Sequence, residues 1–99
     1  MAQPIYKLFM FKPTEAWYQL SEGEKNKHKA QLKEALKKVG GKELVMCFSG
    51  WNSEQFLAWG VEQFPNIEAV QKHHALLVGL NWFRYSESNS FLGTEMGKS

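Results

Sequence analysis

The sequence predicts an α+β fold whose elements follow the order strand, helix, strand, strand, helix, strand. Two observations support it: short apolar or aromatic-rich runs of strand length, and two longer stretches with apolar residues at helical spacing, separated by turn-forming residues. The chain has 99 residues, too few for two ordinary domains. We expect one domain over residues 1–99, with a frayed tail at residues 95–99.

The first predicted strand, IYKLFMFK, covers residues 5–12. It is short and aromatic-rich and is followed by Pro13, which suits a strand better than a helix. Helical spacing of apolar residues begins after Thr14, which can cap a first turn. The sequence therefore predicts a helical unit over about residues 14–39.

Capping residues mark a break inside this unit and its end. Ser21 and Glu24 stand three apart, which is the spacing of a capping box, so we expect a kink near Ser21. Gly40 and Gly41 follow the last apolar residue, and glycine takes the left-handed conformation of a helix C-terminus without strain.

Two further strands are predicted around a short polar turn. KELVMCFSGW covers residues 42–51 and QFLAWGVEQF covers residues 55–64, with the turn at residues 52–54. A connection this short favours an antiparallel hairpin.

The last two elements complete the pattern. Asn66 follows Pro65 and can cap a helix from Ile67 to about Leu80. WFRYSES, residues 82–88, is predicted as the fourth strand, and FLGT either prolongs it or forms a separate edge segment. Right-handed crossovers then place two helices on one face of a four-stranded antiparallel sheet, the ferredoxin-like βαββαβ arrangement.

Composition limits the classes of partner. Hydrophobic residues make up 43% of the chain, enough for a core without metal or disulfide. The formal charge of +2 is too small to indicate nucleic acid or a membrane surface. Cys47 is the single cysteine and lies in the apolar run LVMCF, which suggests a buried thiol in a reducing compartment. With no signal-like or membrane-spanning apolar run, we expect a cytoplasmic protein.

The predicted strands are apolar on both faces. A sheet with helices on one face and water on the other alternates apolar and polar residues. Residues 8–11, 44–48 and 56–59 instead run almost unbroken in apolar side chains. A second copy of the chain is the simplest cover for the free face, so we predict a homodimer packed sheet against sheet.

This order of elements, over nearly the whole chain, resembles the dimeric α+β barrel superfamily, which includes antibiotic-biosynthesis and haem-degrading monooxygenases, stress-responsive barrel proteins and polyketide cyclases. The resemblance rests on element order and pattern rather than on an invariant motif. The segment YKLFMFKPTEAWYQLSEGEK, residues 6–25, is also similar to darcynin-type proteins. The superfamily resemblance implies one pocket per subunit between sheet and helices, lined by aromatic, Asn and His residues.

The stretch QKHHALL carries the strongest candidates for chemistry. The apolar stripe predicted for the second helix is formed by Ile67, Val70, Leu77 and Val78. His73 and His74 fall on opposite borders of this stripe, so either imidazole can point between helix and sheet. A histidine there suits proton transfer near neutrality. The alternative is that one histidine packs at the core edge and the other is solvated. His28, near an apolar stripe on the first helix, is expected to be partly buried.

The residues that could bind a ligand are Trp51, Asn52, Trp59, Arg84, Tyr85 and Tyr6. Trp51 and Asn52 stand beside a turn and could bind and orient a planar ligand. Arg84, between two aromatic residues on the predicted fourth strand, could hold a carboxylate or phenolate, or equally form an intersubunit ion pair. Core packing explains Trp59 as well as ligand binding does. Tyr85 and Tyr6 could donate hydrogen bonds to a substrate oxygen, but a tyrosine on a strand is most often a half-buried side chain.

No metal site is expected, because neighbouring helical histidines diverge by about 100°. Haem is the alternative cofactor. In the haem-degrading proteins the resemblance implies an axial histidine on the second helix, a tryptophan on the preceding strand and an asparagine on the first. Trp59 and either His73 or His74 match two of these roles, but the first strand offers only Lys7 and Lys12 as polar groups.

We therefore expect a small-molecule-binding dimeric barrel with no cofactor. It would act as a cofactor-independent monooxygenase or cyclase on an aromatic or polyketide-like substrate. His73 or His74 would move the proton, and Arg84 or Asn52 would stabilise the negative oxygen. The alternatives are a non-catalytic ligand-binding or structural dimer and a haem-binding or haem-degrading protein.

Overall fold

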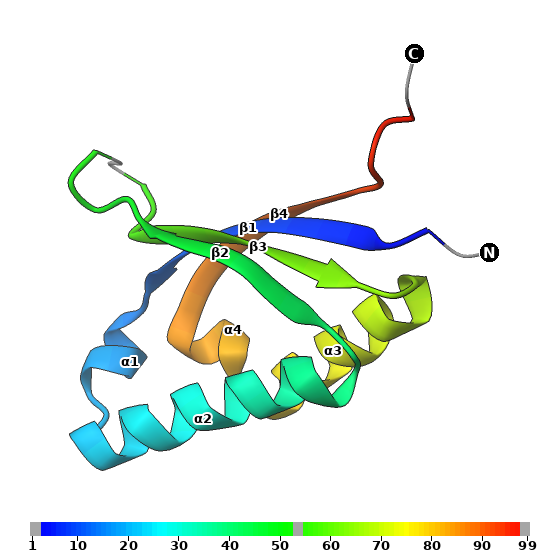
Figure 1. Cartoon of the computed structure of the whole chain (residues 1–99). Helices are drawn as coiled ribbons and strands as arrows, with labels where there is room; N and C mark the ends of the chain where they lie inside the picture. The colour runs from blue at the N-terminus through cyan, green and yellow to red at the C-terminus, as the bar shows by residue number, and fades with distance from the viewer. Residues whose placement is uncertain (1–2, 53–54, 98–99) are drawn as a thin grey trace.

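A computed structural model describes residues 3–52 and 55–97 of the chain. Its elements are β1 (Ile5–Pro13), α1 (Glu15–Tyr18), α2 (Glu22–Lys38), β2 (Lys42–Phe48), β3 (Ala58–Phe64), α3 (Ile67–Gly79), α4 (Trp82–Tyr85) and β4 (Ser86–Gly93). The strands form one antiparallel sheet in the order β2-β3-β1-β4, and the helices lie on one side of it (Figure 1). This is the ferredoxin-like fold predicted from the sequence. Ser53 and Glu54 of the predicted turn and the last two residues of the predicted frayed tail lie outside the described residues.

The predicted capping residues act at both ends of α2. The Ser21 hydroxyl accepts the Glu24 amide at 3.1 Å, and the Glu24 carboxylate accepts the Ser21 amide at 3.0 Å, which completes the capping box. At the other end Gly40 has a φ of 79°, and the amides of Gly40 and Gly41 donate to carbonyls of the last turn. The expected kink at Ser21 is a full break, so α1 and α2 are separate helices.

Residues 82–85 were predicted to begin the fourth strand, and this prediction is wrong, because they form the short helix α4. The Asn81 carbonyl accepts the amides of Arg84 and Tyr85 at 3.1 and 3.2 Å. Thr14, expected to cap α1, makes no cap bond with its side chain and instead donates its hydroxyl to the Arg84 carbonyl at 2.6 Å. These tertiary contacts outweigh the strand propensity of the aromatic residues. β4 then begins at Ser86 and includes most of FLGT.

Residues alternate between the two faces of the sheet along each strand. On the helix side, a core forms near the C-terminal end of α2 and the start of α3, and its fully buried centre is Phe64. The residues packed there are Val39, Phe64, Ala69 and Val70, with Ile5, Leu36 and Leu76 beside them. This core fills only part of the space between sheet and helices.

The face of the sheet opposite the helices is apolar and exposed. Leu8, Val45, Trp59 and Phe91 lie on it, with 36 to 63% of each residue accessible. Within residues 3–52 and 55–97 no helix covers this outer face (Figure 1). The apolar second face that the sequence predicts is therefore present as the outer face of the sheet. None of the described helices is long and apolar enough to cross a bilayer.

Candidate functional site

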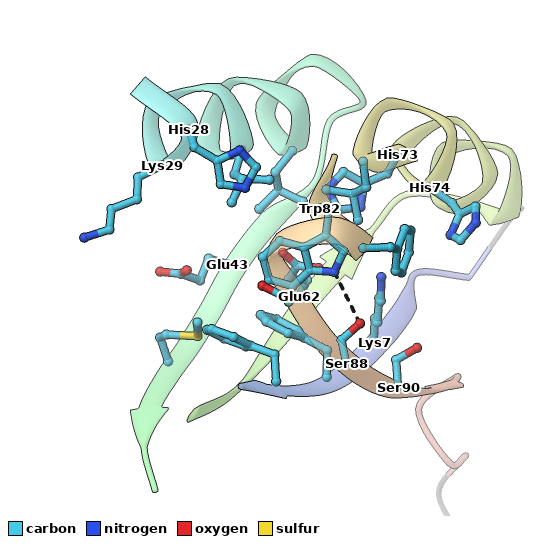
Figure 2. Close-up of a pocket in the computed structure, with 18 of the residues that line it drawn as sticks. Lys7, His28, Lys29, Glu43, Glu62, His73, His74, Trp82, Ser88 and Ser90 are labelled. Atoms are coloured by element: carbon cyan, nitrogen blue, oxygen red, sulfur yellow. Dashed lines mark hydrogen bonds between the residues drawn. The ribbon is translucent and has the colours of Figure 1, made fainter. Parts of the chain in front are cut away.

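A cavity of about 630 Å³ lies between the sheet and the helices (Figure 2). Its volume falls within the range of small-molecule sites. Its apolar wall is formed by Phe9, Phe11, Trp17, Leu32, Leu77 and Trp82. The sequence leaves this space open because Ser86, Ser88 and Ser90 pair with inward-facing residues of β1 where larger apolar residues would fill a core.

His73 lies on the buried side of α3 and lines the cavity. Only 3% of the residue is exposed, its ring packs on Phe64 with centroids 5.2 Å apart, and its buried Nδ1 has no hydrogen-bond partner among the described residues. Burial, with smaller effects from Lys7 and His74, lowers the pKa of His73 to about 4. The imidazole is therefore neutral at physiological pH.

The orientation of α3 differs from the predicted one. Ile67 and Val78, predicted on the apolar stripe, are 45 and 55% exposed, whereas His73 is buried beside Val70 and Leu77. The helix is rotated so that His73 lies within the buried stripe rather than at its border. The core includes Ala69 and Val70 of this helix, while Ile67 remains outside it.

His74 is exposed but also lines this cavity, and its ring centroid lies 5.3 Å from that of Phe83. His28 is buried on α2 between Trp17 and Tyr85, with ring centroids 5.7 and 5.0 Å away. Burial lowers the pKa of His28, and its Nε2 has no hydrogen-bond partner among the described residues. All three histidines thus reach the cavity lining.

Three charged residues of the sheet also line the cavity, and the sequence reasoning missed them. They are Lys7 of β1, Glu43 of β2 and Glu62 of β3. Burial raises the pKa of Glu62 to about 7, with Lys7 opposing and Glu43 adding to the shift. Burial also lowers the pKa of Lys7, against the attraction of Glu62. In the sequence, each of them could be noticed as a charged residue within an apolar strand. Only the register of the strands shows that the three side chains lie on the same face of the sheet.

Trp59 and Asn52 lie away from this cavity. Together they line a second hollow, of about 350 Å³, which also involves Leu8 and Met10. Met10 and Trp59 are paired across β1 and β3, on the face opposite that of Phe9. Trp51 is 79% exposed, and its indole Nε1 donates to the Phe48 carbonyl at 3.2 Å.

The remaining sequence candidates are dispersed. Arg84 stands on α4 rather than on a strand, with its guanidinium carbon 5.9 Å from the centroid of the Tyr85 ring. Tyr85 packs on His28 beside the cavity. Tyr6 donates its hydroxyl to the Glu95 carboxylate at 3.4 Å. The structure therefore brings the histidines together but not the residues expected to stabilise an oxyanion.

The residues suggested for haem are also separated. Trp59 faces the outer side of the sheet, whereas His73 and His74 line the cavity on the helix side. Beneath the histidines, β1 contributes the partly buried ammonium of Lys7 in place of an asparagine. These residues do not fit the haem site that the resemblance implied.

No protein-family model and no curated protein matches the chain. Solved structures do share its fold. A variant of chlorite dismutase from Candidatus Nitrospira defluvii is 11% identical with a TM-score of 0.78, and the match covers 99% of this chain and 42% of that one. The chain thus spans about two fifths of the dismutase chain.

Two further structures match over nearly their full lengths. SnoaB, a cofactor-independent oxygenase from Streptomyces nogalater, is 12% identical with a TM-score of 0.60, and the match covers 98% of this chain and 97% of that one. A dimeric ferredoxin-like protein of unknown function from Bacteroides fragilis is 14% identical with a TM-score of 0.51, covering 93 and 96%. At these identities the similarities establish the fold.

Proposed function

We propose that this chain, whose ferredoxin-like fold is that of the dimeric α+β barrel superfamily, binds a small, largely apolar molecule in the cavity between its sheet and helices. The observation that carries the proposal is the cavity of about 630 Å³, walled by aromatic side chains and reached by the imidazoles of His73 and His74. A flat aromatic or polyketide-like molecule matches such walls in shape and polarity.

The chemistry that fits this site is metal-free proton transfer. A base removes a proton from a phenol or enol, the aromatic walls exclude water, and the anion then reacts with O₂ or cyclises. The likeness of fold to SnoaB, a cofactor-independent oxygenase, supports this class of reaction. His73 and His74 are the groups the sequence suggests for the proton, and Glu62 is a third group in the same cavity.

We also propose that the protein works as a homodimer in which the outer faces of two sheets pack together. The exposed apolar residues of that face support the proposal, as does the likeness to a dimeric ferredoxin-like protein. Of the non-catalytic alternatives, a ligand-binding dimer would also use this cavity, whereas a purely structural dimer would need none.

Filling the cavity tests ligand binding. Leu32, partly buried on α2, lines the cavity, so Leu32→Trp places an indole inside it. We expect wild-type protein to bind 2-methoxynaphthalene saturably in calorimetry, and Leu32→Trp to bind it at least about tenfold more weakly because the space is occupied.

Leu20→Trp is the matched control, because Leu20 is also partly buried and lies between α1 and α2, outside the cavity lining. It should bind like wild type. Equal binding by both variants, or no binding of the probe by wild type, would exclude this cavity as the ligand site.

A further inference from the structure

A row of charged side chains crosses the sheet beneath the cavity. Glu62 of β3 is paired with Lys7 of β1 on one side and with Glu43 of β2 on the other. Paired residues on neighbouring strands have Cβ atoms about 5 Å apart and share a face. All three line the cavity, on the face that carries Phe9. Burying a charged side chain costs free energy unless the charge is paired or hydrogen-bonded.

The charges at the centre of this row are not neutralised by direct contacts. Neither Lys7 nor Glu62 forms an ion pair or a side-chain hydrogen bond with another residue in the described parts of the chain. Both are partly buried. Their hydrogen-bonding capacity is therefore directed into the cavity (Figure 2).

The helix side of the cavity places a neutral group above this row. His73 lies close enough for the Lys7 charge to lower its pKa, and its Nδ1 is buried without a partner among the described residues. The titratable or charged groups that line the cavity are Lys7 of β1, Glu43 of β2, Glu62 of β3, His28, Lys29 and Lys33 of α2, and His73 and His74 of α3. Of these, Lys7 and Glu43 flank Glu62 directly on the sheet.

We propose that Glu62 is the proton acceptor of the cavity and that Lys7 holds the anion it creates, so that the ligand is flat, largely apolar and carries one weakly acidic hydroxyl, as in a phenol or an enol. In this step the O–H bond of the ligand breaks and its proton bonds to a carboxylate oxygen of Glu62. The electron pair stays on the ligand oxygen, beside the Lys7 ammonium. The proposal rests on the proposed function and assigns the proton to Glu62 rather than to a histidine.

The charges of the row also argue against other ligands. Within the row on the sheet, a permanent anion beside Lys7 would also meet the carboxylates of Glu62 and Glu43. A permanent cation would meet Lys7, with Lys29 and Lys33 lining the cavity from α2. A neutral hydroxyl avoids both repulsions and can donate to the Glu62 carboxylate. Because the pKa of Glu62 is about 7, this residue can accept and return a proton near neutrality.

Four naphthalene probes that differ only in one group test the ligand class. They are 2-naphthol, its methyl ether 2-methoxynaphthalene, 2-naphthoate and the ammonium ion of 2-naphthylmethylamine. We expect wild-type protein to bind 2-naphthol most tightly, and its affinity to rise as the pH increases through about 7, where Glu62 ionises. The affinity for the methyl ether, which has no proton to donate, should not show this rise.

Variants of the row test the role of Glu62. Glu62→Gln should weaken the binding of 2-naphthol at least about tenfold above neutral pH and remove the rise in affinity with pH, and it should affect the binding of the methyl ether less. Glu43→Gln is the matched control: it removes a charge that raises the pKa of Glu62, so the rise should persist and move to lower pH. Lys7→Met should move the rise in 2-naphthol affinity to higher pH, because the Lys7 charge lowers the pKa of Glu62.

The outcomes separate this proposal from the proposed function. If wild type binds the methyl ether but shows no preference for 2-naphthol, or if Glu62→Gln keeps the full pH dependence, the role of Glu62 is overturned and the cavity remains a ligand site. Tighter binding of the naphthoate or the ammonium probe overturns the ligand class. Binding of none of the probes overturns both proposals.

Discussion

His73 and Glu62 face the same cavity, and burial moves their pKa values in opposite directions. The pKa of His73 falls to about 4 and that of Glu62 rises to about 7, because burial disfavours the charged form of each. A group poised near pH 7 exchanges protons more readily than an imidazole that protonates only in acid. The local environment of each residue therefore makes Glu62 better suited than His73 to proton transfer near neutral pH.

The low pKa of His73 predicts acid sensitivity. In the unfolded chain His73 protonates near pH 6.5, whereas in the folded protein it does so near 4. Its contribution to stability is therefore present above pH 6.5 and is lost as the pH falls toward 4. We expect the free energy of unfolding of wild type, relative to His73→Leu, to fall by about 3 kcal/mol over this interval, measured by urea unfolding at each pH.

The control is Glu62→Gln, because Glu62 should change the free energy of unfolding with pH in the opposite direction to His73. The pKa of Glu62 is raised from 4.5 to about 7, so its contribution is present below pH 4.5 and is lost as the pH rises through 7. Glu62→Gln should therefore gain stability relative to wild type as the pH increases. A His73→Leu difference that does not vary with pH would mean that His73 titrates normally in the folded state.

Among the elements, α2 shows how far local capping determines structure. Its start at Ser21 and its end before Gly40 follow from side-chain and backbone chemistry within a few residues. By contrast, α4 depends on contacts with Thr14, about 70 residues away in sequence. Elements defined by local capping were predicted correctly, and the element held by a distant contact was not.

The positive φ of Gly40 predicts a specific cost. Gly40→Ala puts a Cβ on a left-handed residue, and we expect it to lower the free energy of unfolding by about 1 kcal/mol in urea titrations. Gly79→Ala at the end of α3 is the control, because its Cβ would meet no atom within 4 Å. It should not destabilise the protein. Equal effects of the two substitutions would contradict the role assigned to Gly40.

For the molecule as a whole, the outer face of the sheet is the exposed apolar surface that no described helix covers (Figure 1). Val45 there and Val78 on α3 are similarly exposed, at 42 and 55%, but only Val45 lies on the proposed dimer interface. Val45→Lys should shift the protein from dimer to monomer in sedimentation velocity, since an unpaired ammonium in an apolar interface is costly. Val78→Lys should remain dimeric.

Two results would contradict the proposed dimer. One is a wild-type protein that sediments as a monomer at all concentrations. The other is a Val45→Lys variant that dimerises as well as Val78→Lys does, because the interface would then lie elsewhere than the outer face of the sheet.

The sequence by itself determined the order of the four strands and the two long helices, the caps of α2 and α3 and the ferredoxin-like fold. The Asn66 cap of α3, for example, forms as predicted, with its side-chain oxygen accepting the Ala69 amide at 2.8 Å. These features depend on interactions between residues close in sequence, and on hydrophobic periodicity that the sequence displays directly.

Only the tertiary structure decided which side chains share the cavity. A slip of one residue in strand register moves every side chain to the opposite face, and successive helix residues differ by about 100° in direction. The sequence could therefore name His73 but could not place Lys7 and Glu62 beneath it, nor put Trp59 on the other face. The site is a product of register and helix rotation, which distant contacts determine.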